Sequence, residues 1–223
     1  MITQLHHRAP AAGDDRVLLV MLPGVGIEAS EFAENGMVKA VQAHGWAVDV
    51  VAVRPDLELY LDGEIAAVLH RHVVEPALAQ GYTRIWLLGI SLGGMGALLY
   101  ASTHAALVEG LVLLAPFLGT RGTMTELAKA GGLASWSPAG SIATDHEQRM
   151  LKWLQGFLLR QPERPALYLG YGCDDRFAPG HRILAEAMRQ DDVVTEAGGH
   201  DWDSWLKLWR RVLEKSPFAG GGQ

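Results

Sequence analysis

The chain has 223 residues, a formal net charge of −6 at pH 7 and a hydrophobic content of 49%. A chain of this length can fold as one domain that buries roughly 70% of its unfolded surface. The acidic balance and the lack of a long basic run argue against nucleic-acid binding, and the lack of an apolar stretch of ~20 residues argues against a transmembrane helix.

Strand and helix patterns alternate along the first half of the chain. Continuous apolar runs predict buried strands at residues 17–22, 46–53, 84–90 and 111–115. Helical spacing and end signals predict helices between them at residues 30–44, 61–80 and 91–104. Asn35 and Gly36 should weaken the first helix, and Pro76 should kink the second or end it early.

The alternation pauses over residues 117–164, which have no strand pattern and one clear helix, with Thr144 and Glu147 as its capping box. It resumes with strands at 166–171 and 193–194 and helices at about 180–190 and 201–215. These patterns predict an α/β fold with a mostly parallel sheet of six strands, or slightly more, and helices on both faces. We expect residues 1–223 to form one domain, with 117–164 as a helical cap insertion above the carboxyl ends of the strands.

The junction after the third strand carries the strongest chemical signal. In the segment 89–93, Ser91 stands between Gly89 and Gly93, where a buried strand ends and a helix begins. A turn that lifts a serine hydroxyl above a parallel sheet strains the backbone and crowds the residues two positions away, so glycine is needed there. The following helix directs its N-terminal N–H groups to the place where an oxyanion would form. The pattern predicts a nucleophile elbow.

A serine hydroxyl needs a base within hydrogen-bond reach, and that base needs a carboxylate that fixes its tautomer. Candidates for both follow the last two predicted strands. Asp174 and Asp175 come after strand 166–171, and His200 comes after strand 193–194. The chain order Ser, Asp, His is that of the α/β-hydrolases and differs from the orders in chymotrypsin and subtilisin.

On these three segments, the chain resembles the α/β-hydrolase superfamily from residue 17 to about residue 213, and within it the small bacterial serine esterases and lipase-like proteins. The resemblance implies cleavage of carboxylic esters through a Ser-His-Asp acyl-enzyme mechanism, with a small-molecule ester or acyl substrate and no cofactor. The N-terminal strands of larger members are expected to be shortened or missing, because only sixteen residues precede Val17.

The resemblance also implies a role for particular residues. In such proteins the acid lies three residues after the glycine that ends its strand, with a proline four residues further on, as Gly172, Asp175 and Pro179 do here. Asp175 is therefore the expected acid, with Asp174 as the alternative. The expected base is His200, which follows a glycine pair and precedes a helix.

The oxyanion hole is expected at two backbone N–H groups. The segment Pro23-Gly24-Val25 lies where the family often has His-Gly-x, whose third residue donates an N–H, so Val25 is one expected donor. Proline stands here in place of the histidine. The second expected donor is Leu92, directly after the nucleophile.

Other interpretations of these residues remain open at this point. Ser91 can be an ordinary helix N-cap, and Asp174 or Asp175 can cap the next helix. His70 and His72 suggest a metal site, but a spacing of two places them on different faces of a helix, and we predict no metal. Serine at position 91 separates this chain from relatives whose nucleophile is aspartate or cysteine.

The substrate pocket is the least specified part of the site. Four large apolar side chains in the 117–164 stretch either line an acyl pocket or seal that stretch onto the sheet: Trp136, Trp153, Phe157 and Leu158. The scarcity of basic residues near the proposed loops gives no support for a phosphorylated or coenzyme A substrate, although Arg121 and Arg176 could serve one. A thioesterase, an acyltransferase or a non-catalytic ligand-binding protein that retains the fold are the alternative functions.

Cysteine usage and the two chain ends bear on the cellular compartment. Cys173 is the only cysteine, which excludes an internal disulfide and is typical of proteins in the reducing cytoplasm. The first sixteen residues are polar and lack the apolar core of a signal peptide. Residues 220–223 are expected to be a disordered tail. We predict a cytoplasmic protein, and no pattern predicts its oligomeric state.

Overall fold

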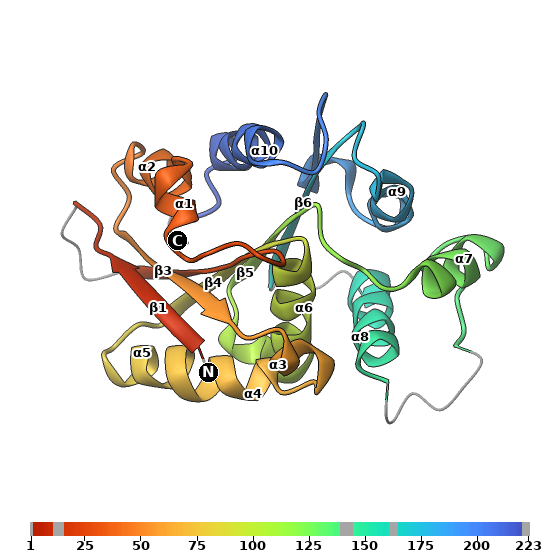
Figure 1. Ribbon diagram of the computed structural model, residues 1–223, viewed down its shortest axis with the longest axis horizontal. Helices are drawn as coiled ribbons and strands as arrows, with labels where there is room; N and C mark the ends of the chain where they lie inside the picture. Colours follow the sequence, from red (N-terminus) through yellow and green to blue (C-terminus); the bar gives the residue numbers. More distant parts are fainter. Residues whose placement is uncertain (1, 11–15, 139–144, 161–164, 220–223) are drawn as a thin grey trace.

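The computed structural model describes residues 2–10, 16–138, 145–160 and 165–219. In this part of the chain, seven strands form one sheet in the order β1-β3-β2-β4-β5-β6-β7 (Figure 1). Only β1 and β3 pair in antiparallel fashion, so the predicted mostly parallel sheet is confirmed. The strands are β1 (Ile2–His7), β2 (Val17–Leu22), β3 (Val48–Pro55), β4 (Arg84–Ile90), β5 (Gly110–Leu114), β6 (Ala166–Gly172) and β7 (Val193–Glu196).

Helices cover both faces of this sheet. On one face α2 packs against α10, and on the other α6 lies between α4 and α8 (Figure 1). The α-helices are α1 (Glu31–Glu34), α2 (Met37–Gln42), α3 (Glu58–Leu61), α4 (Ile65–Leu69), α5 (Glu75–Ala79), α6 (Leu92–His104), α7 (Arg121–Lys129), α8 (His146–Arg160), α9 (Ala178–Glu186) and α10 (Trp202–Glu214). Shorter turns are a π-helical turn (His70–Val74) and two 3₁₀ turns (Ala105–Leu107 and Gln190–Asp192).

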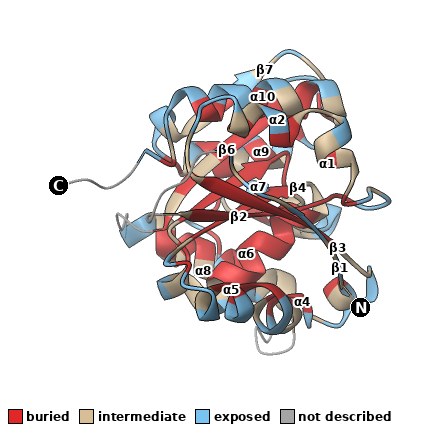
Figure 2. Cartoon of the chain, turned by 90° about the vertical axis from the view of Figure 1, so that its left-hand side faces the viewer, coloured by how far each residue is buried: buried red, intermediate tan, exposed pale blue. Residues whose placement is uncertain are grey.

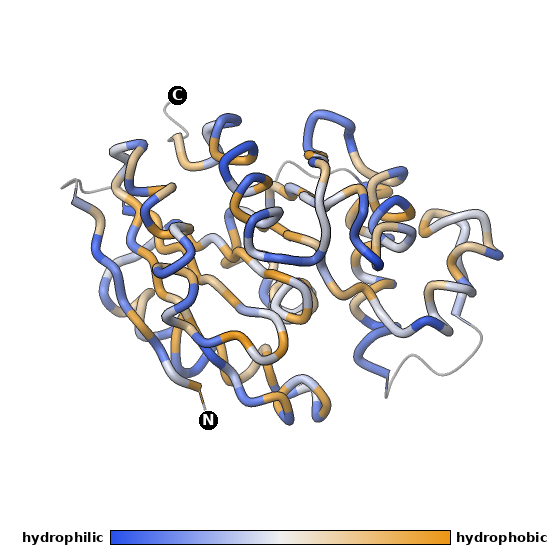
Figure 3. Tube along the Cα trace, turned by 45° about the horizontal axis from the view of Figure 1, so that its top comes forward, coloured by the Kyte–Doolittle hydropathy of each residue, from blue (hydrophilic) through white to orange (hydrophobic). Residues whose placement is uncertain are grey.

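The hydrophobic core has two layers, one on each face of the sheet. All six residues of β2 are buried. Leu18, Val20 and Leu22 enter the layer below α4 and α6, whereas Val17, Leu19 and Met21 enter the layer below α2 and α10. Figure 2 shows the buried central strands, and in Figure 3 the surrounding helices alternate between hydrophobic and hydrophilic residues. Burial on both faces explains why this strand is a continuous apolar run.

The order of the strands creates a crevice near the middle of the sheet. β2 lies between β3 and β4, so the chain moves to one side of β2 first and to the other side afterwards. At such a switch point, the loops that follow the adjacent strands β2 and β4 leave in opposite directions, which makes room for a ligand between them. The loop beginning at Pro23 and the turn at Ser91 stand at the carboxyl ends of β2 and β4.

β1 is an addition to the predicted strands. It forms the edge of the sheet and pairs with β3 from Ile2↔Pro55 to His7↔Val50. None of its residues is buried, and Leu5 is exposed. An edge strand without a buried face needs no apolar pattern, so the polar composition of this segment gave no strand signal.

The predicted helix over residues 61–80 is divided in the structure. It consists of α4, the π-helical turn and α5, and it continues past Pro76 instead of ending there. The proline nitrogen carries no hydrogen, so it cannot donate to the carbonyl of His72 four residues earlier. That carbonyl accepts a hydrogen bond from Gln4 Nε2 of β1 at 2.9 Å. A π turn and a bond from a neighbouring strand thus accommodate the proline.

The predicted helix over residues 30–44 is also divided. It breaks into α1 and α2 at the Asn35 and Gly36 pair, where the sequence pattern is weak. Gly36 adopts φ 80°, a left-handed conformation that favours glycine. The side chain of Ser30, expected as the cap, makes no capping hydrogen bond.

The 117–164 stretch contains two helices among its described residues, α7 and α8, of which only α8 was predicted. Thr144 of the expected capping box lies outside the described residues. Asp145 Oδ1 accepts a hydrogen bond from the Gln148 N–H at 3.0 Å and caps α8. Glu147 Oε2 accepts one from the Thr120 N–H at 3.0 Å, which ties the start of α8 to the start of α7.

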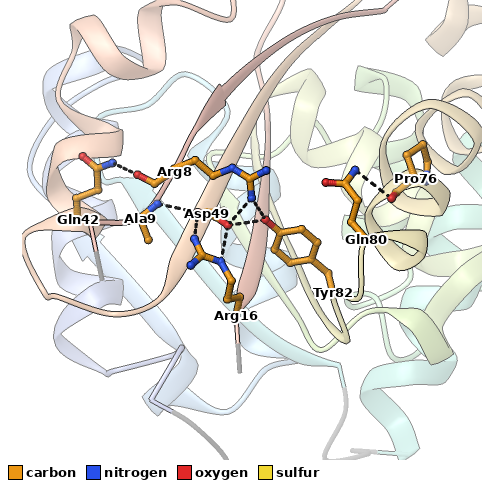
Figure 4. A network of polar contacts seen from close by, with 8 residues as sticks. All are labelled: Arg8, Ala9, Arg16, Gln42, Asp49, Pro76, Gln80 and Tyr82. Carbon is orange, nitrogen blue, oxygen red and sulfur yellow. Dashed lines mark hydrogen bonds and ion pairs between the residues drawn. The ribbon is translucent and has the colours of Figure 1, made fainter. Parts of the chain in front are cut away.

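Asp49, the second residue of β3, organises a polar cluster at the amino ends of the parallel strands (Figure 4). It is nearly fully buried. Its carboxylate accepts hydrogen bonds from Arg8, from the Ala9 N–H at 2.7 Å, from Arg16 Nε at 2.8 Å and from the Tyr82 hydroxyl. The cluster fixes the segment after β1 and the residue before β2 onto the sheet, on the side opposite the crevice.

Replacement of Asp49 by asparagine should destabilise the fold. Burial by itself would raise the pKa of Asp49, but hydrogen bonds from Arg16, Tyr82 and Ala9 outweigh it and lower the pKa from 3.8 to about 2. That shift corresponds to about 2 kcal/mol of stability at neutral pH. Urea unfolding at pH 7 should show Asp49→Asn losing about this free energy or more.

The sign of the pH dependence follows from the lowered pKa. The contribution is complete above the unfolded pKa of about 4 and is lost as the pH falls towards about 2. The stability difference between wild type and Asp49→Asn should therefore shrink as the pH falls below about 4. Asp62→Asn, which changes an exposed aspartate, is the control. Equal stability of the two variants at pH 7 would contradict the role given to this cluster.

Candidate active site

Ser91 stands at the sharp turn between β4 and α6. Its backbone has φ 51° and ψ −116°, which is rare for a residue with a side chain. The Ser91 N–H donates to the Leu114 carbonyl at 3.0 Å, and the Ser91 carbonyl accepts from the Phe117 N–H at 2.8 Å. Bonds to the end of β5 and to the loop after it therefore hold the strained turn in place.

The two flanking glycines are required by close backbone approach. A Cβ atom at Gly89 would overlap the carbonyl of Gly93, and a Cβ atom at Gly93 would overlap the carbonyl of Leu22. Neither backbone can move away easily, because Gly89 is in β4 and Leu22 ends β2. The steric reason predicted for these glycines is confirmed.

His200 and Asp175 are directly bonded. His200 Nδ1 lies 2.7 Å from Asp175 Oδ2, and the side chain of Asp175 is fully buried while that of His200 is 17% exposed. Since a carboxylate only accepts, Nδ1 carries the hydrogen, and in the neutral ring Nε2 is then free to accept a proton. The Phe177 N–H donates to the other oxygen, Oδ1, at 2.8 Å.

The two hydrogen bonds to Asp175 keep it ionised. Burial by itself would raise the pKa of this carboxyl, but the bonds from His200 and from the Phe177 N–H outweigh burial, so the pKa lies below its ordinary value. At neutral pH the carboxylate is therefore charged. It can hold the imidazole in one tautomer and stabilise a positive charge on it.

Asp174 has a different set of contacts. Its Oδ2 accepts a hydrogen bond from the Gly198 N–H at 3.2 Å, and its own N–H donates to the Gly198 carbonyl at 3.0 Å. This reciprocal pair ties the loop after β6 to the loop that carries His200. Of the two candidate carboxylates, the structure places Asp175 against the histidine.

Aromatic rings enclose the imidazole of His200. The rings of Phe177 and Trp205 both meet it edge to face, each with a centroid distance of 5.1 Å. Phe177 comes from the loop that carries Asp175, and Trp205 comes from α10. These contacts restrict rotation of the ring and add to the orientation that Asp175 imposes.

Ser91 and His200 line one cavity of about 850 Å³ at the carboxyl ends of the strands. Among the described residues no hydrogen bond joins the Ser91 hydroxyl to the imidazole. In enzymes without substrate such bonds are often long and tighten only when substrate binds, so a shared cavity is the relevant geometry. The other residues of its wall are Gly24, Val25, Ile27, Leu57, Tyr60, Leu61, Leu92, Met95, Phe117, Thr120, Asp145, His146, Glu147, Arg176, Phe177 and Trp205.

Val25 and Leu92, the expected oxyanion donors, both line this cavity. The turn of Val25 runs close to the serine, since a Cβ at Gly24 would lie 3.2 Å from the Cβ of Ser91. Leu92 is the first residue of α6, where a helix leaves its N–H groups without internal partners. Among the described residues, no backbone carbonyl accepts from either N–H.

Comparison with known proteins bears on the fold. No protein-family model and no curated protein sequence matches the chain. FphF, a fluorophosphonate-binding serine hydrolase of Staphylococcus aureus, has a TM-score of 0.66 at 13% identity, with 97% of this chain and 98% of that chain covered. The S-formylglutathione hydrolase FrmB of the same species has a TM-score of 0.64 at 14% identity, with coverages of 95% and 83%.

A third solved structure with a similar fold is a named α/β-hydrolase. MGS-MChE2, an α/β-hydrolase enzyme from the sediment metagenome of the Mar Chica lagoon in Morocco, has a TM-score of 0.56 at 18% identity, with 96% of this chain and 94% of that chain covered. The chain has the α/β-hydrolase fold. The fold class predicted from the sequence is thus confirmed.

The four aromatic and aliphatic side chains proposed for the pocket lie elsewhere in this α/β-hydrolase fold. None of them is in the wall of the cavity that Ser91 lines. All four belong to the core or pack against it: Trp136, Trp153, Phe157 and Leu158. Phe157 and Leu158 border a separate cavity of about 270 Å³ beside Tyr168. The packing fits the other interpretation, in which these residues seal the 117–164 stretch onto the rest of the fold.

The apolar side chains that do line the cavity were missed as a pocket wall, although Val25 and Leu92 were expected there as backbone N–H donors. Four of them are unusually exposed for their type: Val25 at 67%, Leu57 at 45%, Leu61 at 71% and Phe177 at 39%. They follow β2, β3 and β6, at the edge where this fold binds ligands. Their position just after predicted strands is the signal that could have identified them.

The metal interpretation of the histidines finds no support in the described residues. No group of three or more histidine, cysteine, aspartate or glutamate side chains there could hold a metal ion. His70 Nδ1 lies 3.1 Å from the Tyr100 hydroxyl, and its ring stacks on His104. None of the helices in this described part of the chain combines the length and hydrophobicity that a bilayer span requires.

Proposed function

We propose that this protein is a serine hydrolase that cleaves carboxylic esters, with Ser91 as nucleophile, His200 as general base and Asp175 as the residue that orients the base. The observation that carries the proposal is the 2.7 Å hydrogen bond between His200 and a buried, ionised Asp175, in a cavity that the strained Ser91 also lines. A serine at a strained turn, beside an oriented imidazole, is the arrangement that nucleophilic acyl transfer requires.

The reaction follows from these positions. Ser91 Oγ attacks the ester carbonyl carbon while His200 Nε2 takes its proton, and Asp175 stabilises the imidazolium that forms. The tetrahedral intermediate collapses, the C–O bond to the alcohol breaks, and Nε2 returns the proton to the departing oxygen. Water, deprotonated by Nε2, then attacks the acyl-serine, and the acid leaves as Ser91 recovers its proton.

The N–H groups of Val25 and Leu92 are the proposed oxyanion donors. Both border the cavity next to Ser91 and lack a backbone acceptor among the described residues. A donor placed in this way stabilises the transition state by about 3 kcal/mol. The proline that replaces the family's usual histidine stands at position 23, two residues before Val25. It therefore does not remove the Val25 N–H.

The walls of the cavity favour an ester with an apolar part. Exposed apolar side chains form much of the rim, and Thr120 and residues 145–147 of the 117–164 stretch complete it. We therefore propose that this stretch shapes the substrate site within one domain. A thioesterase on the same residues is the second candidate, because the S-formylglutathione hydrolase with a similar fold is named for a thioester substrate.

Labelling with a fluorophosphonate probe tests the proposed nucleophile. The folded protein should form a stoichiometric covalent adduct whose mass spectrum places the phosphorus on Ser91, since the probe reacts only with activated serines. Protein unfolded in urea before the probe is added serves as the control and should not react. Absence of an adduct on the folded protein would favour the non-catalytic ligand-binding alternative.

A further inference from the structure

A second chamber adjoins the cavity of Ser91. It measures about 420 Å³ and lies between the loop after β5 and the loop that leads into α9. Its wall shares Phe117, Arg176 and Phe177 with the Ser91 cavity, so the two cavities adjoin along these residues. A substrate whose carbonyl lies at Ser91 can therefore extend into this chamber.

The chamber has an unusual charge for this chain. Two arginines line it: Arg121, the first residue of α7, and Arg176, in the loop after β6. Its lining residues include no aspartate or glutamate, and the carboxylate of Glu147, which packs against Gly119 of the wall, accepts a hydrogen bond from the Thr120 N–H. The protein as a whole carries a formal net charge of −6. A locally cationic chamber in an acidic chain attracts anions selectively.

Neither arginine is neutralised by a carboxylate among the described residues. Other arginines of the chain are paired in this way: Arg16 with Asp49, Arg84 with Glu109 and Arg211 with Glu196. Arg176 instead contacts an aromatic ring, because its guanidinium lies 4.6 Å from the centroid of Phe177. That contact holds the cation beside a ring that lines both cavities.

The rest of the chamber is mainly apolar. Its wall contains Leu118, Met124 and Pro179 beside the two phenylalanines. Apolar walls with cationic groups at one side suit a ligand that has a hydrocarbon part and an anionic end.

We propose that this chamber binds an anionic group, a carboxylate or a phosphate, on the part of the substrate that extends from the ester carbonyl. The inference rests on the proposed esterase function and makes it specific. Arg121 and Arg176 are the residues that select the anion, and Phe117 and Phe177 direct the hydrocarbon part between the two cavities.

Calorimetric titration tests the chamber without requiring catalysis. Octanoate and octyl phosphate carry the two anionic groups on the same hydrocarbon, and 1-octanol is the neutral probe. At least one anion should bind roughly tenfold more tightly than octanol, and Arg121→Gln should remove about that factor. Whichever of octanoate and octyl phosphate binds more tightly identifies the anionic group that the chamber prefers. Arg210→Gln, an exposed arginine of α10 outside both cavities, makes the same change in net charge and is the control.

Hydrolysis of a matched ester pair tests the link to the substrate. The ratio of kcat/KM for the p-nitrophenyl monoester of suberic acid to that for p-nitrophenyl octanoate should fall about tenfold in Arg121→Gln, mainly through KM. The proposal is overturned if the three probes bind equally, if Arg121→Gln and Arg210→Gln act alike, or if the ratio does not change. Failure to hydrolyse either ester would instead reject the esterase function, and the titration would still decide whether the chamber binds anions.

Discussion

Ser91→Ala should abolish hydrolysis of p-nitrophenyl esters, lowering kcat by about 10⁵-fold, because the proposed acyl-enzyme cannot form without the hydroxyl. The residual rate would reflect the oxyanion donors and binding alone. The melting temperature should hardly change, since alanine has the same Cβ and meets the same strain at φ 51°. Steady-state kinetics and a thermal melt of the same preparation measure both effects.

Two further serine variants make this result specific. Ser102→Ala removes a hydroxyl from the same helix, where it donates to the Leu99 carbonyl, and should keep near-normal turnover. Ser91→Gly should be as inactive as Ser91→Ala but more stable, because relief of roughly 1–3 kcal/mol of backbone strain exceeds the roughly 0.5–1 kcal/mol entropic cost of glycine. Ester turnover by Ser91→Ala near the wild-type rate would reject Ser91 as the nucleophile.

The features predicted correctly from the sequence are those with a local cause. β4 is buried on both faces, so it is a continuous apolar run, and the turn after it needs glycine at positions 89 and 93 whatever the rest of the chain does. The assignment of Asp175 rested on a resemblance in spacing, and the structure adds the contact with His200 that local sequence cannot contain.

The features that were missed depend on distant parts of the chain. β1 forms because β3 offers a free edge, and nothing in the composition of its own residues requires a strand. Trp136 has the large apolar side chain expected of a pocket residue, yet that side chain is buried. The backbone carbonyl of Trp136 accepts a hydrogen bond from Gln155 on α8. The lining residues Leu57 and Leu61 belong to a segment brought to the cavity by the end of β3. Such positions are set by tertiary packing, which periodicity does not encode.

Asp175→Asn should lower kcat at neutral pH by about 10⁴-fold while leaving the fold intact. In the wild type, Oδ1 accepts from the Phe177 N–H and Oδ2 accepts from His200. Asparagine has only one oxygen. If that oxygen keeps the bond to Phe177, the amide NH₂ faces Nδ1 and forces the ring hydrogen onto Nε2, which then cannot take the proton of Ser91. The loss of charge also removes stabilisation of the imidazolium.

Asp174→Asn is the matched control, because it makes the same chemical change one residue away. Asp174 bonds to the backbone of Gly198 and not to the imidazole, so this variant should lose no more than about tenfold in kcat, through a looser His200 loop. Circular dichroism and steady-state kinetics of the two variants compare fold and rate side by side. A larger loss in Asp174→Asn than in Asp175→Asn would reverse the assignment, since orientation of the base would then depend on the loop contact and not on the carboxylate that touches the histidine.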